Sequence, residues 1–88
     1  MKISQQKKEK ISEQILATLF SISPKPMFTA HIAREIARDE EFIKSLLQQL
    51  QFKKFVTEVK MNPKGINYIR RSRWKLSDLT YHVYKNKQ

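Results

Sequence analysis

Two short apolar patterns with helical spacing are separated by only two residues, Arg38 and Asp39. The first predicts a helix of about two turns with Thr29 as its N-cap, and the second predicts a helix over residues 40–52 capped by Asp39. So short a connection forces the two helices to cross steeply. The side chains expected to face inward are Ile32, Ala33, Ile36, Ala37, Phe42, Ile43, Leu46, Leu47 and Leu50.

A longer apolar stripe precedes this pair and predicts a helix over residues 5–22. The segment 23–26 contains two prolines and ends that helix, because the residue before a proline is restricted from the helical region. Met27 and Phe28 follow as short apolar plugs against the core. The stripe of the first helix consists of Ile11, Ile15, Leu16, Leu19, Phe20 and Ile22.

After residue 54 the apolar period changes from helix to strand. Residues 55–61 are rich in strand formers, residues 62–65 suit a type I turn, and residues 66–76 predict a return strand. Alternation along that strand directs Trp74 and Leu76 to the core and the basic residues to water. Ser77 is placed to cap a short final helix, whose apolar residues are Leu79, Val83 and Tyr84.

The composition excludes several kinds of functional site. Eighty-eight residues make one domain, and the absence of cysteine excludes disulfides, thiolate metal sites and cysteine nucleophiles. His31 and His82 have no partner at metal-ligand spacing, and a single glycine excludes a glycine-rich phosphate loop. We therefore expect no enzyme activity, no metal and no cofactor. Without a signal-peptide or membrane-spanning pattern, the expected location is the cytoplasm, with the nucleoid if the chain binds DNA.

The net charge of +10 attracts polyanions, nucleic acid first and an anionic membrane surface or acidic protein second. Residues 53–88 hold ten Lys and Arg against two Asp and Glu, so the positive charge belongs to the expected hairpin and the C-terminal helix after it. Arginines crowded on one hairpin favour contact with a nucleic-acid backbone. The backbone-binding candidates are Lys60, Lys64, Arg70, Arg71, Arg73 and Lys75.

The order of these elements resembles the winged helix-turn-helix domain of prokaryotic transcriptional regulators. Residues 28–37 look like the second helix of such regulators, residues 42–56 like their recognition helix and entry to the wing, and residues 73–77 like the end of the wing. The resemblance implies a mainly α, α+β fold: a three-helix core, a two-stranded β-hairpin wing and a short C-terminal helix. The single domain would span residues 1–88, with the helix-turn-helix at about 29–53 and the wing at about 55–76.

By this resemblance the third helix faces the major groove of double-stranded DNA. A glutamine side chain can form two hydrogen bonds with one adenine, and a lysine can contact guanine or phosphate. Two features depart from the family pattern: Lys54 stands where a left-handed glycine is usual, and the third helix begins with Asp39, Glu40 and Glu41. The base-facing candidates are Lys44, Ser45, Gln48 and Gln49.

Two other functions stay open. The domain could be an adaptor that binds a basic protein partner through the acidic start of the third helix, or it could bind structured RNA through the same basic wing. No membrane partner is expected. A homodimer would use helix one or the C-terminal helix, because the chain lacks the extra long helix through which many such regulators dimerise.

Overall fold

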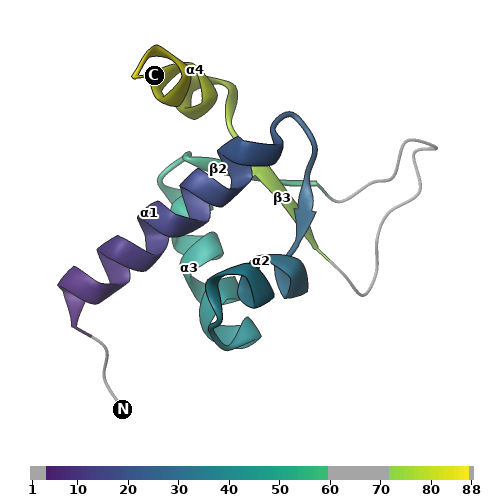
Figure 1. Cartoon of the computed structure of the whole chain (residues 1–88). Coiled ribbons are helices and arrows are strands. Elements are labelled where there is room, and N and C mark those ends of the chain that lie inside the picture. Colours follow the sequence, from purple (N-terminus) through teal and green to yellow (C-terminus); the bar gives the residue numbers. More distant parts are fainter. Residues whose placement is uncertain (1–3, 60–71, 88) are drawn as a thin grey trace.

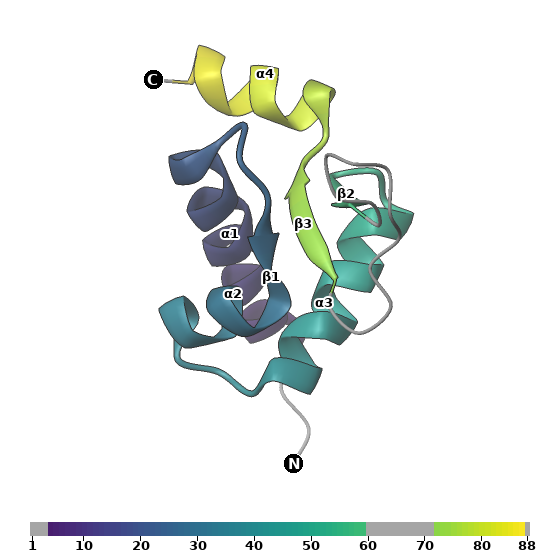
Figure 2. The same cartoon turned by 90° about the vertical axis from the view of Figure 1, so that its right-hand side faces the viewer.

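The computed structural model describes residues 4–59 and 72–87, and Figure 1 shows the course of the chain. Three helices pack together beside a small antiparallel sheet, and the last helix lies at one end of it (Figure 2). The helices are α1 (Gln5–Ile22), α2 (Thr29–Ile36), α3 (Glu40–Phe52) and α4 (Asp78–Asn86). The strands are β1 (Met27–Phe28), β2 (Val56–Val59) and β3 (Arg73–Leu76).

The core joins all three packed helices to the sheet, as the apolar patterns predict. Ile15, Ile32 and Leu47 are completely buried, one from each of α1, α2 and α3. Trp74 and Leu76 of β3 are 1% and 4% exposed, which confirms that this strand closes the core. The other core residues are Ile11, Leu16, Leu19, Ala33, Ile43, Leu46, Leu50 and Val56.

The sheet has one strand more than the predicted hairpin. β3 lies in the middle, paired with β2 on one side and with β1 on the other, both antiparallel. Met27 lies opposite Trp74, and Phe28 lies opposite Arg73. The residues predicted as apolar plugs therefore also form a strand, which the sequence did not reveal because two residues are too short for an alternating pattern.

Thr29 does not cap α2, and this prediction was wrong. The N-cap is Phe28, which makes no side-chain capping bond. The Thr29 hydroxyl is buried instead, where its oxygen accepts a hydrogen bond from the indole Nε1 of Trp74 at 2.8 Å. The Thr29 backbone N–H also donates to the carbonyl of Ser72 at 3.2 Å. The start of α2 is thus attached to β3.

Two of the residues that the structure describes are non-glycine residues with a left-handed backbone, and both lie at the ends of helices. Ala37, with φ of 61°, ends α2 as an exposed C-cap, so its predicted place on the inner face was wrong. Lys54, with φ of 67°, occupies the position where glycine was expected. A non-glycine residue in this region costs about 1–2 kcal/mol. The first of these turns lies in the short connection between α2 and α3.

The caps of the other two predicted helices are confirmed. Asp39 begins α3, and its carboxylate accepts from the backbone N–H of Phe42 at 3.2 Å. Ser77 caps the start of α4 in the same way, because its hydroxyl oxygen accepts from the backbone N–H of Thr80 at 3.3 Å. No helix within 4–59 or 72–87 is both long and apolar enough to cross a membrane.

The apolar face predicted for α4 was wrong in part. Leu79 is 75% exposed and Val83 is 45% exposed, whereas Tyr81 and Tyr84 pack against Phe20 of α1 with ring centroids 5.6 and 5.7 Å apart. Partial burial, and secondly the charge of Glu13, raise the pKa of Tyr84 above its usual value. The tyrosines occupy the inner face because their larger rings reach α1 from this short helix.

Candidate nucleic-acid interface

The outer face of α3 is the surface on which the four base-facing candidates lie. Lys44, Ser45, Gln48 and Gln49 are all exposed, while the opposite face of the same helix is buried in the core. The Ser45 hydroxyl donates to the carbonyl of Phe42 at 2.7 Å. Its proton is therefore engaged within the helix, and toward a ligand this side chain is an acceptor.

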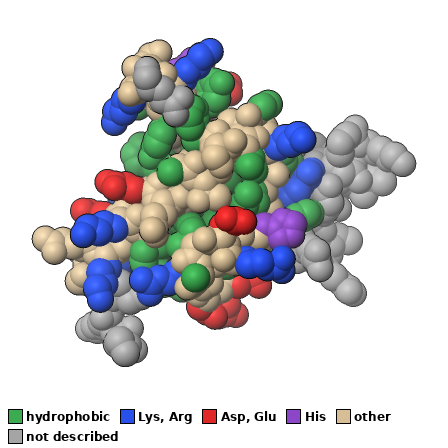
Figure 3. Space-filling view, viewed as in Figure 1, with side chains coloured by type: hydrophobic (Ala, Val, Ile, Leu, Met, Phe, Trp, Pro, Cys, Tyr) green, Lys and Arg blue, Asp and Glu red, His purple; other side chains and the backbone are tan. Residues whose placement is uncertain are grey.

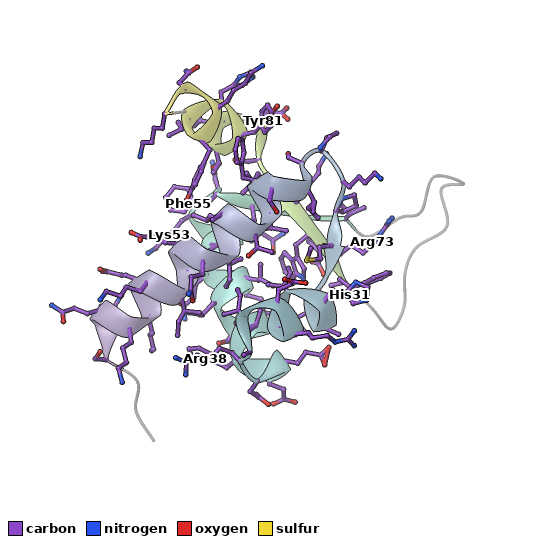
Figure 4. All side chains as sticks on the ribbon, viewed as in Figure 1. His31, Arg38, Lys53, Phe55, Arg73 and Tyr81 are labelled. Atoms are coloured by element: carbon purple, nitrogen blue, oxygen red, sulfur yellow. The ribbon has the colours of Figure 1, made fainter. Side chains whose placement is uncertain are left out.

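The four base-facing candidates on α3 do not all lie beside the same part of the molecule. Lys44 lies beside a hollow of about 540 Å³ between the start of α2 and the start of α3. Gln49 lies beside a smaller hollow of about 210 Å³ against α1, together with Lys53 and Phe55. Figure 4 shows these last two side chains on the α1 side of the molecule. Lys44 and Gln49 therefore border two different hollows, one beside α2 and the other beside α1.

The larger hollow is lined by two further candidate residues that the sequence analysis did not select. His31 and Arg34 of α2 are exposed and line it, so Arg34 brings positive charge, and both side chains bring hydrogen-bond donors, to the same place as Lys44. Their spacing of three residues on a helix was the available signal, since it places both on one side. Glu40 and Glu41 line the hollow from the start of α3.

Arg73 adds a further cation at the base of the wing. It is half-buried instead of facing water, and its guanidinium carbon lies 5.8 Å from the centre of the Phe28 ring. The edge of His31 meets the same ring, with centroids 5.8 Å apart. Figure 4 shows Arg73 and His31 on the same side of the molecule, and in Figure 3 a histidine and basic side chains gather there, over α2 and β1.

Phe28 thus holds a cation–π contact and an edge-on ring contact together, which limits the freedom of both basic side chains. We name the four residues His31, Arg34, Lys44 and Arg73 the basic cluster. It comes from α2, α3 and β3, so only the folded chain assembles it.

The other wing candidates are placed differently. Lys75 is half-buried at the α4 end of β3, beside a hollow that also involves Asp78 and His82. It does not line the hollow between α2 and α3. At the base of the wing, the Ser72 hydroxyl donates to the carboxylate of Glu58. The predictions for Lys60, Lys64, Arg70 and Arg71 lie outside the described residues.

Neither metal nor membrane chemistry is indicated in the part of the chain that the structure describes. No group of three or more His, Cys, Asp or Glu residues within 4–59 and 72–87 is placed to hold a metal ion. His31 and His82 are both exposed.

Comparisons with known proteins define the class of fold. No protein-family model matches the sequence, and no curated protein matches it. Among solved structures, the DNA complex of MepR from Staphylococcus aureus matches with a TM-score of 0.72 and 18% identity, covering 93% of this chain and 67% of MepR. MepR is a transcription regulator of the multidrug efflux pump MepA.

Two further matches agree. The transcriptional regulator PcaV from Streptomyces coelicolor has a TM-score of 0.65 and 19% identity, covering 84% of this chain and 48% of PcaV. AF1382 from Archaeoglobus fulgidus has a TM-score of 0.69 and 14% identity, covering 90% of this chain and 81% of that protein. The chain has the winged helix-turn-helix fold that these proteins share, as the sequence resemblance implied. It spans about half the length of several of them, 53% for a MepR mutant.

Proposed function

We propose that this chain is a DNA-binding domain of a transcriptional regulator, with α3 at the major groove and the wing on the phosphate backbone. The observation that carries the proposal is the exposed polar face of α3 directly beside the basic cluster. Lys44 belongs to both, so groove and backbone contacts are adjacent. The likeness in fold to MepR, which has been crystallised with DNA, supports DNA as the partner.

In this arrangement the residues have distinct tasks. Gln48 offers an amide that suits adenine, and Lys44 can contact guanine or a phosphate, while Ser45 accepts from a base. Gln49 contacts the edge of the groove nearest α1. Arg73 contacts phosphate at the base of the wing, and His31 and Arg34 contact the flanking strand. The remaining backbone contacts are proposed for Lys60, Lys64, Arg70, Arg71 and Lys75.

Changing Arg70, Arg71 and Arg73 together to Ala weakens duplex binding and reduces its dependence on salt. Each phosphate contact contributes about 0.9 to the slope of log affinity against log salt, so the slope flattens by roughly three units if all three arginines bind phosphate. The measurement is fluorescence anisotropy of a labelled random duplex at several salt concentrations.

The matched control removes three exposed lysines far from α3, as Lys25→Ala, Lys85→Ala and Lys87→Ala. This control lowers the net charge by the same three units as the arginine variant. It should leave most of the salt dependence of duplex binding unchanged. If the wild type shows no salt-sensitive duplex binding at low ionic strength, the DNA proposal fails. Competition with duplex RNA tests the alternative that the same charges bind structured RNA, and a circular dichroism melt shows whether each variant is folded.

We also propose that the chain forms a homodimer through α4. Leu79 and Val83 are one helical turn apart and exposed on the same side of α4, whereas its inner side is held by the two tyrosines on α1. Paired half-sites on DNA would then follow from a two-fold axis between two copies.

The change Leu79→Lys moves the protein from dimer to monomer in sedimentation equilibrium, because a charge replaces an apolar contact at the centre of the pairing face. The matched control, Ala17→Lys, adds the same charge to an exposed position of α1. Dissociation by the control alone assigns the dimer to helix one instead. A wild type that is monomeric at every accessible concentration contradicts the proposal.

A further inference from the structure

The most exposed large apolar side chain among the described residues belongs to the proposed recognition helix. Phe52, the last residue of α3, is 89% exposed. Residues four apart on a helix lie one above the other, so Lys44, Gln48 and Phe52 form a single row along its outer face. The row is about 12 Å long at 1.5 Å per residue, which matches three to four base steps.

Backbone hydrogen bonds fix the end of α3 around Phe52. Directly after it, the N–H of Lys53 donates to Gln49 at 3.0 Å, and the N–H of Phe55 donates back to Leu50 at 2.9 Å. Leu50 itself is 5% exposed, so the end of α3 is anchored in the core. The fold therefore holds Phe52 outward.

We propose that Phe52 contacts the 5-methyl group of a thymine in the major groove, next to the base that Gln48 contacts. This methyl group is the one apolar feature that a base presents in that groove, and Phe is among the side chains that contact it. A glutamine that selects adenine and a ring that selects thymine together specify A·T base pairs. The inference rests on the proposed function and adds a specificity residue to it.

The test begins with selection of preferred duplexes from a random library by the wild-type protein. Each thymine of a selected duplex is then replaced in turn by uracil, which differs only in lacking the methyl group. Burial of one methyl group corresponds to about a fourfold change in affinity. One uracil position should therefore weaken wild-type binding about fourfold, while Phe52→Ala should bind the thymine and uracil duplexes equally.

The matched control is Phe55→Ala, which removes another partly exposed ring three residues further on and outside the row. It should keep the thymine preference, and a thermal melt of each variant confirms folding. If no duplex is selected at all, the proposed function fails and the inference fails with it. If duplexes are selected but Phe52→Ala retains the thymine preference, or loses affinity equally for both duplexes, only the inference is overturned.

Discussion

Replacing Thr29 by Val destabilises the fold by about 1–3 kcal/mol, because the indole N–H of Trp74 then loses its acceptor in a buried place. Valine has nearly the same shape, so the change removes the hydrogen bond without leaving a large cavity. Both the start of α2 and the wing strand depend on this contact. The free energy of unfolding is measured by urea denaturation followed by circular dichroism.

Thr57→Val is the control, since it makes the same chemical change at an exposed position of β2. Its effect should stay within about 0.5 kcal/mol. Equal urea midpoints for the two variants would show that the Thr29–Trp74 hydrogen bond contributes nothing.

Charge reversal of Glu40 and Glu41 to Lys strengthens duplex binding, by at least about tenfold at low salt if each lysine gains a phosphate contact. Both carboxylates line the hollow beside Lys44, where they oppose the approach of DNA. The salt slope should steepen by about 0.9 for each new contact. The variant is less stable by about 0.3–1 kcal/mol per site, since lysine is unfavourable at a helix N-terminus.

Glu9→Lys with Glu13→Lys on α1 makes the same change in net charge away from the start of α3. A purely long-range effect of charge would strengthen binding equally in both variants and would contradict the proposed location of the DNA. If instead the acidic start of α3 binds a basic protein, Glu40→Lys with Glu41→Lys abolishes capture of that partner and does not improve duplex binding.

Much of the fold followed from periodicity and capping. The bounds of α1 and α3, the caps Asp39 and Ser77 and the burial of Trp74 were all predicted correctly, because each depends on a local pattern or a single residue type. Local chemistry determined these features, so the sequence alone was sufficient. Lys54 is a different case: the family resemblance placed it where a left-handed glycine is usual, and its backbone is left-handed there.

The errors have a common physical origin. Thr29 has a good capping side chain, but a buried indole 45 residues later competes for its hydroxyl. The apolar side chains of α4 could not be oriented without knowing that Phe20 would attract the tyrosines. Likewise the basic cluster joins His31 to Arg73 through Phe28, a contact that no short motif predicts. Tertiary contacts decided each case.

The position of Trp74 has a practical consequence. It is the only tryptophan in the sequence, and it is buried where the wing strand is bonded to the start of α2. Its fluorescence therefore comes from a single place, the junction between the two parts proposed to contact DNA. A shift in its emission when a duplex is added would report a change in the surroundings of that junction without any attached dye.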